Sequence, residues 1–388
     1  MLRVLTLSTL FPDASRPNFG VFVERQTQGL SEAEGVEVRV VAPVGVPPWP
    51  LSRLRHRALS ALPRQETWRG LTVHRPRFLA IPGTGGRWHA RMLTRALIPV
   101  LDAIRRDFAF DVIDASFFFP DGPTAVALGR RYGVPVSIKA RGADIHHWGR
   151  VGPTAAQVLK AGCAADGLLA VSSAMRDDMI ALGMPGDRIR VHHTGVDAAA
   201  FRPRNRVEAK ARLRLDGPAV LSLGALIPRK GHDIVLRAAA MLPGVTLMIV
   251  GDGPERGRLE ALAAELRIAD RVQLMGSVAH HALPDVIAAA DVMALASSSE
   301  GLANAWIEAL ASGTPIVIPA IGGAHEVVTS ADAGRVVART REAFAAGIAE
   351  MIARPPHPDA VAATVQRFTW QANTTALVAH LKSLVAAR

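Results

Sequence analysis

Two glutamates in one short stretch have the type and spacing to bind a charged or hydroxyl-bearing substrate. Glu300 and Glu308 lie in 297–312, SSSEGLANAWIEALAS, directly after the apolar run 292–296. This pattern predicts a buried strand, a tight turn at Gly301 and a helix. At about 100° per residue, their spacing leaves the two carboxylates roughly 80° apart, so both can border one crevice. The alternative is a solvated pair of glutamates beside a turn.

Two adjacent cations stand at another predicted turn. Arg229 and Lys230, in the segment PRKG, precede a predicted helix at 232–242. An arginine that binds bidentately and a lysine that acts as a point charge suit a diphosphate, aided by helix-terminal amides. The amides of 302–304 would likewise favour an anion. A solvated basic turn is the alternative for 228–231.

Alternating strands and helices must position these residues. Apolar runs predict buried parallel strands in two consecutive series: 4–7, 36–41, 112–115, 136–139, 167–171 and 189–192, then 220–223, 246–250, 272–275, 292–295 and 316–318. We therefore expect an α/β protein with two Rossmann-like domains facing each other across a cleft. The expected domains are 1–202, joined by a C-terminal helix at about 369–388, and 203–368. Between 43 and 90 we expect loops with one short strand at 71–74.

Composition excludes several classes. The chain has 388 residues and one cysteine, so a disulfide framework and a Cys-rich metal site are excluded. No apolar run is long enough to cross a membrane, and the first segment is interpreted as a strand rather than a signal peptide. A cytoplasmic setting is expected, with Cys163 buried. The adjacent histidine pairs diverge in direction and no acid-x-acid cluster is present, so no metal is expected.

The net charge of +11 is concentrated in one region. Between 51 and 106, only Glu66 and Asp102 oppose a series of arginines, which are Arg53, Arg55, Arg57, Arg64, Arg69, Arg75, Arg77, Arg87, Arg91, Arg95, Arg105 and Arg106. Apolar residues interleave with them, namely Trp49, Leu51, Leu54, Trp68 and Trp88. This pattern favours an anionic membrane surface on the inner face of the plasma membrane. An arginine-rich solvated surface is the alternative, and no nucleic-acid motif accompanies the charge.

A glycine-rich turn, GDGPERG at 251–257, gives a weaker signal. Gly251, Gly253 and Gly257 follow a predicted strand, but their spacing differs from that of a dinucleotide fingerprint. A structural turn is the main interpretation. A nicotinamide-dependent oxidoreductase would need this turn to hold a dinucleotide.

The order of these motifs resembles a known family. The run LGALIPRKGHDIVLRA, LMIVGDGPERGRLEALAAEL and DRVQLMGSVAHHALPDVIAAADVMALASSSEGLANAWIEALASGTPIVIPAIGGAHEVV is similar to the C-terminal domain of retaining glycosyltransferases of GT-B fold, family 4 (the glycosyltransferase family 1/4-like group). FPDASRPNFGVFVERQ, FFFPDG, IKARGADI and HHTGVDAAAFRP resemble its N-terminal half.

The resemblance implies a role for each matching residue. Lys230 and Arg229 would bind the donor diphosphate, Glu308 the ribose hydroxyls, and Glu300 would lie near the donor sugar. Asp144 matches a polar position that faces donor and acceptor. The remaining expected donor contacts come from Gly20, Arg141, Gly253, Val278, Gly301, Leu302, Ala303 and Asn304. Two departures stand out, because many relatives have arginine at Ala225 and histidine at Arg141. A histidine that many carry near 115–117 is also missing.

The implied activity is transfer of a sugar from UDP- or GDP-sugar to a saccharide or lipid-linked acceptor, in glycan synthesis of the cell-envelope or exopolysaccharide type. No cofactor and no metal is implied. A nucleotide-sugar epimerase or hydrolase of the same fold, and a catalytically silent nucleotide-sugar-binding protein, remain alternatives.

Overall fold

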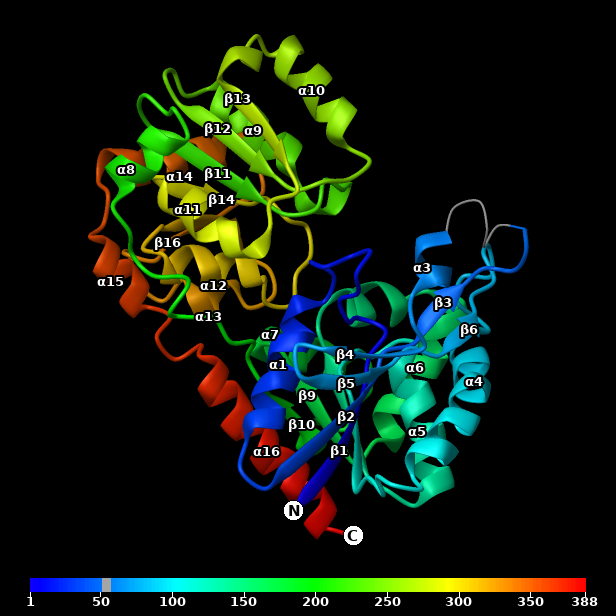
Figure 1. Ribbon diagram of the computed structural model, residues 1–388. Helices are drawn as coiled ribbons and strands as arrows, with labels where there is room; N and C mark the ends of the chain where they lie inside the picture. The colour runs from blue at the N-terminus through cyan, green and yellow to red at the C-terminus, as the bar shows by residue number, and fades with distance from the viewer. Residues whose placement is uncertain (51–56) are drawn as a thin grey trace. The chain divides into compact units, whose positions relative to one another are not determined.

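The computed structural model describes residues 1–50 and 57–388. These residues form two compact units, described separately below (Figure 1). The N-terminal unit comprises Met1–Gly195 and Trp370–Arg388, and the C-terminal unit comprises Val196–Thr369. Four residues of the expected membrane-facing surface, Leu51, Arg53, Leu54 and Arg55, lie outside the described residues.

The N-terminal unit contains a parallel sheet flanked by helices. Its order is β10-β9-β8-β7-β1-β2-β5-β4, and β4 pairs antiparallel with β5. The strands are β1 (Leu2–Leu7), β2 (Val36–Val41), β4 (Gln65–Trp68), β5 (Leu71–His74), β7 (Val112–Ala115), β8 (Val136–Ala140), β9 (Gly167–Ala170) and β10 (Ile189–Val191). A separate parallel pair joins β3 (Val44–Val46) and β6 (Arg77–Leu79). The helices are α1 (Val21–Glu32), α3 (Arg57–Ala61), α4 (His89–Ile104), α5 (Asp121–Tyr132), α6 (Gly152–Ala164), α7 (Ser173–Ala181) and α16 (Trp370–Ala386).

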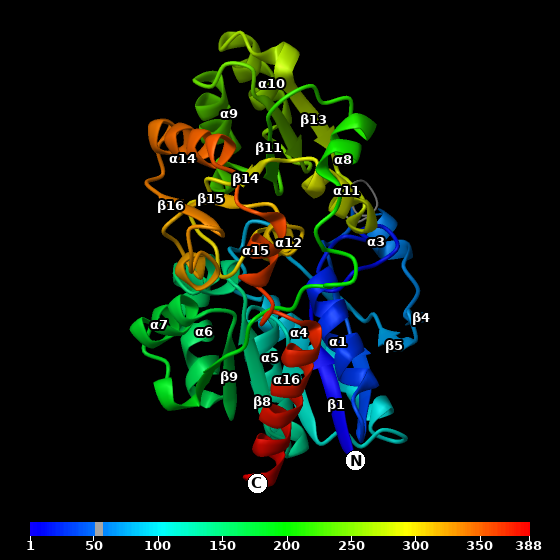
Figure 2. The same ribbon diagram turned by 90° about the vertical axis from the view of Figure 1, so that its left-hand side faces the viewer.

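Helices cover both faces of this sheet. The C-terminal helix α16 lies beside α1 on one face, and α4 and α5 lie on the other (Figure 1, Figure 2). On the α16 side, Val4 and Val112 of the central strands pack with Leu377 and Leu381 in one buried cluster. The near-continuous apolar strands of the sequence are therefore explained by burial on both faces.

The region 43–90 is more ordered than the sequence predicts. The strand expected at 71–74 is confirmed as β5, but β3, β4, β6 and α3 were not predicted. Their short segments, such as QETW in β4 and RFL in β6, contain too few apolar residues to give a periodic signal.

The C-terminal unit has a six-stranded parallel sheet in the order β13-β12-β11-β14-β15-β16. Its strands are β11 (Ala219–Leu223), β12 (Thr246–Val250), β13 (Val272–Gly276), β14 (Val292–Ala294), β15 (Ile316–Pro319) and β16 (Gly334–Val337). Its helices are α8 (Arg206–Arg212), α9 (His232–Ala240), α10 (Arg256–Glu265), α11 (Leu283–Ala288), α12 (Asn304–Ala311), α13 (Ala324–Val327), α14 (Arg341–Ala353) and α15 (Pro358–Ala363). Val235 of α9 and Phe344 of α14 pack on Val220 and Ile249 in one apolar core of this unit.

The structure divides the chain slightly before the sequence-derived boundary at 202. Val196 pairs with Thr369 in an isolated parallel bridge, and buried Phe201 packs edge-on against His280. These contacts assign 196–202 to the C-terminal unit. Among the described residues, no helix is long and apolar enough to cross a membrane.

Candidate functional site

Glu300 lies in the loop that joins β14 to α12, and its carboxylate is surrounded by donors. One oxygen, Oε1, accepts hydrogen bonds from Lys230 Nζ at 2.6 Å and from Ser297 Oγ at 2.7 Å. The other, Oε2, lies 3.5 Å from a guanidinium nitrogen of Arg229. The structure thus brings together three of the predicted site residues around one buried carboxylate.

The turn that carries the two cations is pressed against the glutamate loop. Gly231 has φ 66°, and a side chain there would approach the Ala296 carbonyl oxygen to 2.1 Å. Only glycine therefore fits this position. The Ser298 amide donates to the Arg229 carbonyl oxygen at 2.8 Å, which fixes the two loops to each other.

The backbone beyond Glu300 leads directly into the N-terminus of α12. Ala303 is the N-cap of α12 and provides no side-chain cap to the first amides of the helix. Leu302 and Ala303 are buried, and the Gly323 amide donates to the Gly301 carbonyl oxygen at 2.8 Å. The segment Gly301–Asn304 is thus held in place while a helix N-terminus remains next to Glu300, an arrangement that favours an anion.

Glu308 lies on α12 and has a different partner. Its Oε1 lies 2.9 Å from His280 Nε2, in the turn His280–Ala282. The ring of Phe201 packs edge-on against His280, with centroids 5.2 Å apart. Sequence reasoning considered His280 only as half of a metal-chelating pair and missed this contact, because nothing local relates positions 280 and 308.

A second histidine that sequence reasoning missed supports the cationic turn. His232, the first residue of α9, is buried, and burial lowers its pKa to about 4. Its Nε2 donates to the Ala225 carbonyl oxygen at 3.2 Å, so its neutral Nδ1 accepts from Ser222 Oγ at 2.8 Å. His232 thus fixes the backbone at Ala225, the position where many relatives have arginine.

Gly253 and Val278 lie in two neighbouring strand-end loops. Gly253 follows β12, where the Leu226 amide donates to the Asp252 carbonyl oxygen at 2.9 Å. Val278 is half-buried between β13 and the His280 turn. Both positions lie beyond the carboxyl ends of their strands, the edge at which open α/β sheets bind ligands.

In the N-terminal unit, Gly20 and Arg141 also follow strands. Gly20 caps α1 with φ 72°, and a side chain there would lie 2.6 Å from the Leu10 carbonyl oxygen. Arg141 Nε donates to the Ser116 carbonyl oxygen at 2.6 Å, and its guanidinium lies over the Phe22 ring. Burial lowers the pKa of Arg141 to about 10, so the side chain stays charged at neutral pH.

Asp144 does not have the expected surroundings. The family resemblance implies a group that faces donor and acceptor, but in this structure Asp144 is 0% exposed. Its oxygens accept hydrogen bonds from the amides of Gly142 at 2.7 Å, Arg141 at 3.0 Å and Phe118 at 3.1 Å. Asp144 therefore anchors the loop after β8, and in this structure its oxygens are occupied by backbone amides.

A buried polar cluster next to this loop was not predicted. Lys139, on β8, is fully buried between Gln26 Oε1 at 2.9 Å and His192 Nδ1 at 2.8 Å. His192 Nε2 donates to the Asn373 carbonyl oxygen of α16 at 2.8 Å, which leaves Nδ1 as the acceptor. Burial lowers the pKa of Lys139 and His192 well below their usual values, and raises the pKa of Asp114 to about 6.

Several arginines of the basic region have structural roles. Arg75 is buried and pairs with Glu66, Arg77 donates to main-chain carbonyl oxygens, and Arg105 lies over the Phe110 ring. The exposed described members are Arg57, Arg64, Arg69, Arg87, Arg91, Arg95 and Arg106. The charge available to a membrane is therefore smaller than the sequence suggests.

Cys163 is exposed, contrary to expectation. It lies on the outer side of α6, whose buried residues are Thr154, Val158, Ala161 and Gly162.

Two family models match the two halves of the chain. The model described as Glycosyltransferase Family 4 matches residues 20–200, and the model described as Glycosyl transferases group 1 matches residues 203–369. Each half of the chain thus resembles the corresponding half of these enzymes.

Curated relatives agree with these matches. TuaC of Bacillus subtilis (strain 168), a glycosyltransferase assigned to teichuronic acid biosynthesis, is 26% identical over 378 residues, which cover 94% of each chain. The D-inositol 3-phosphate glycosyltransferase of Mycolicibacterium gilvum (strain PYR-GCK) is 37% identical over 204 residues, or 50% of this chain. That second alignment spans only 46% of the relative.

Solved structures share the fold along the whole chain. Sucrose-phosphate synthase from Thermosynechococcus elongatus aligns with a TM-score of 0.85 at 21% identity and covers 100% of both chains. Anabaena HepE, solved in complex with UDP and glucose, aligns with a TM-score of 0.76 at 19% identity and covers 99% of this chain and 100% of its own. At these identities the likeness establishes the fold.

Proposed function

Because the chain belongs to the group 1 and family 4 glycosyltransferases of GT-B fold, we propose that it transfers a sugar from a UDP- or GDP-sugar with retention of anomeric configuration. The acceptor in this proposal is a saccharide or a lipid-linked saccharide of a cell-envelope or exopolysaccharide-type glycan. The relatives support the proposal, since HepE has been solved with UDP-glucose and TuaC is assigned to a cell-envelope polymer.

One observation carries the proposal most directly. Lys230 and Arg229 converge on Glu300 beside the N-terminus of α12. Two cations and a set of helix amides form a compact site for a diphosphate. Glu300 restrains both cations without neutralising the pair, since two positive charges face one negative charge.

In the proposed reaction, the bond between the sugar C1 and the diphosphate oxygen breaks while the acceptor oxygen bonds C1 on the same face. The acceptor proton passes to the departing phosphate oxygen, so the step needs no protein base and agrees with the lack of a histidine at Arg141. Lys230 and Arg229 stabilise the charge that develops on the diphosphate, which is the main contribution of the protein. Glu308 would hold the ribose hydroxyls and Glu300 would border the sugar.

The proposal is tested by product analysis with and without acceptor. A panel of UDP- and GDP-sugars is incubated with glycan and lipid-linked acceptors, and products are identified by mass and anomeric configuration. A retained linkage in the product supports the proposal. Free sugar without acceptor dependence would indicate a hydrolase, an isomerised donor would indicate an epimerase, and binding without turnover would indicate a silent binding protein.

We also propose that the N-terminal unit touches an anionic membrane surface. Exposed aromatic side chains, Trp49 at 76% and Trp88 at 40%, accompany the exposed arginines Arg91 and Arg95 of α4. Exposed tryptophan and arginine side chains are typical of regions that contact the interface of an anionic membrane. Sedimentation with anionic vesicles tests this: R91E/R95E should lose binding, whereas unchanged, salt-insensitive sedimentation would contradict it.

A further inference from the structure

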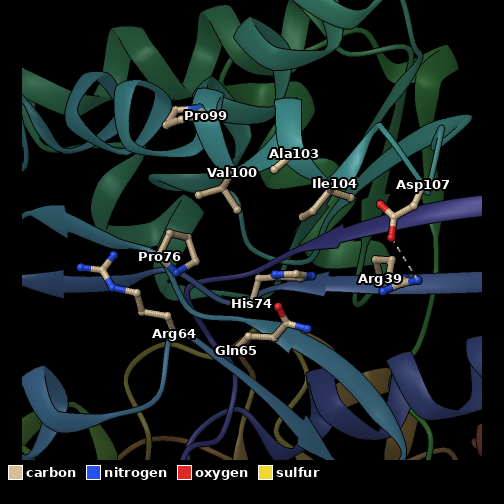
Figure 3. Close-up of a pocket in the computed structure, with 10 residues that line it drawn as sticks. All are labelled: Arg39, Arg64, Gln65, His74, Pro76, Pro99, Val100, Ala103, Ile104 and Asp107. Carbon is tan, nitrogen blue, oxygen red and sulfur yellow. Dashed lines mark ion pairs between the residues drawn. The ribbon is translucent and has the colours of Figure 1, made fainter.

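A groove in the N-terminal unit shares no residue with the candidate site. Its volume is about 510 Å³, and it lies between α4 and the sheet edge β2-β5-β4 (Figure 3). The residues that line it are Arg39, Arg64, Gln65, His74, Pro76, Pro99, Val100, Ala103, Ile104 and Asp107.

The strand pairing explains why the floor of the groove is polar. Successive strand residues point to opposite faces. Val40 and Val73, which are register partners, pack with Leu71 in a buried cluster on the other face of the sheet. Arg39 and His74 therefore point toward α4, and Gln65 is the register partner of His74 on β4.

The wall of the groove is apolar. Pro99, Val100, Ala103 and Ile104 form a stripe on the last turns of α4, and Figure 3 shows them across the groove from the strand residues. The polar strand face and the apolar helix stripe do not pack directly against each other, because polar groups buried in such a contact would lack hydrogen-bond partners. This mismatch leaves the cavity open.

Among the described residues, His74 in the groove has an unsatisfied ring nitrogen and Arg64 has no ion-pair partner. The Nε2 atom of His74 is buried and has no hydrogen-bond partner among the described residues. Arg64 is exposed and forms no ion pair within the described part of the chain. Arg39, by contrast, lies 4.0 Å from Asp107.

The charges of the groove sum to a single positive excess. Asp107 offsets Arg39, and burial together with Arg39 lowers the pKa of His74, which leaves the imidazole neutral at pH 7. The uncompensated charge is that of Arg64. A ligand with one negative group next to an apolar body would complement both the charge and the wall.

We propose that this groove binds an amphiphilic anion, in which one phosphate or carboxylate is joined to an apolar group. The anionic group pairs with Arg64 and accepts a hydrogen bond from His74 or Gln65. The apolar group packs along Val100 and Ile104. A lipid headgroup and a soluble phosphate ester offer the same chemistry.

Octyl phosphate is the direct probe, with inorganic phosphate and octyl glucoside as ligands that carry only the charge or only the chain. Binding is measured by calorimetric titration. We expect octyl phosphate to bind at least tenfold more tightly than either control ligand. R64Q, which removes an exposed guanidinium, should weaken octyl phosphate about tenfold.

A second variant, A103W, fills the groove from an exposed position of α4 and should abolish binding. R106Q and A127W, the latter on α5, are matched controls, because both positions are exposed and neither lines the groove. Equal binding of octyl phosphate by wild type, R64Q and A103W would overturn the proposal, as would binding no tighter than that of octyl glucoside.

Vesicles distinguish the two sources of the ligand. If the occupant is a lipid, phosphatidylglycerol vesicles recruit the wild type and the R106Q control at least threefold more than R64Q. If R64Q loses octyl phosphate but keeps vesicle binding, the occupant is a soluble ester. The groove proposal stands apart from sugar transfer, since octyl phosphate binding does not require any transferase activity.

Discussion

Charged side chains are partnered differently in the two units. In the C-terminal unit, Lys230 and Arg229 both pair with Glu300. The side chains of Lys230, Arg229 and Glu300 remain 15%, 39% and 10% exposed. In the N-terminal unit, Asp144 and Lys139 are 0% exposed, and protein groups occupy their hydrogen-bonding atoms. The first arrangement retains capacity for a ligand, while the second stabilises a loop and a strand. Similar residue types thus form a partly exposed ion-paired cluster in one unit, where we propose ligand binding, and a fully buried network in the other.

The largest functional effect is expected at Lys230. K230A removes one of the two cations proposed to stabilise the leaving diphosphate, and kcat should fall roughly 10²- to 10³-fold, as for loss of one preorganised charge-stabilising donor. The kcat is measured per folded molecule, because K230A also removes an ion-pair partner of the buried Glu300 carboxylate. K160A, on the exposed side of α6, is the control for loss of a lysine. A kcat within threefold of wild type would remove Lys230 from the reaction.

The buried carboxyl of Asp114, in the N-terminal unit, should make the stability of the protein depend on pH. Its folded pKa of about 6 exceeds the usual 3.8, so the folded state holds its proton more tightly than the unfolded state. Stability from this group is present below about pH 4 and is lost as pH rises through 6, by roughly 3 kcal/mol. D114N should not show this loss.

Urea unfolding of wild type and D114N at about pH 4.5 and pH 7.5 measures the difference. The wild type should lose stability relative to D114N over this interval, whereas D177N, at an exposed position, should follow the wild type. Parallel curves for wild type and D114N would show that the Asp114 carboxyl is not perturbed.

Asp144 separates an anchoring role from a catalytic one. D144N replaces one amide-accepting oxygen with a donor, and the free energy of unfolding should fall by about 2–3 kcal/mol because buried amides lose their acceptor. Activity per folded molecule should remain within a few-fold of wild type. Lost turnover at unchanged stability would instead assign Asp144 to the reaction.

Glu308 should affect binding more than turnover. E308A removes charged acceptors for the ribose hydroxyls, and nucleotide affinity should fall roughly 10- to 30-fold. E265A, on the exposed side of α10, is the matched control. The affinity ratio of ribonucleotide to 2′-deoxynucleotide is measured for the wild type and for E308A. If the two proteins give the same ratio, Glu308 does not contact the ribose.

The smallest effect is expected at His280, which contacts Glu308 and which we propose acts only by positioning that carboxylate. H280A should weaken nucleotide binding about three- to tenfold and raise KM with little change in kcat. H281A, the exposed neighbour, should behave like wild type. In the E308A background, H280A should cause no further loss of nucleotide affinity. A double variant whose loss equals the sum of the two single losses would contradict the positioning role.

The sequence predicted those elements whose signal is local. Thr246–Val250 and the α12 region could be predicted because a continuous apolar run and a run of strong helix formers each suffice. The short strands β3, β4 and β6 could not, since their pairing partners, not their composition, make them strands.

In the candidate site, too, the residues with a local sequence signal could be predicted, whereas contacts between distant residues could not. The turn 228–231 and Glu300 were predicted as candidates from residue type, but their mutual contact depends on the close approach that Gly231 permits. Glu308 contacts His280, and Lys139 contacts His192. These partners are distant in the sequence, so no local pattern predicts the contacts. The burial of Asp144 likewise depends on the loop that folds around it.

We propose that the C-terminal unit binds a nucleoside diphosphate through Lys230 and Glu308. A thermal-shift titration with UDP, GDP, their sugars and NAD tests it most directly, because a ligand at a hundredfold excess over its Kd stabilises the folded state by about 2.7 kcal/mol. We expect one of UDP or GDP, with its sugars, to raise the midpoint of the wild type, and K230A and E308A to need higher concentrations for the same shift. A shift with NAD alone, or equal shifts in wild type and both variants, would contradict the claim.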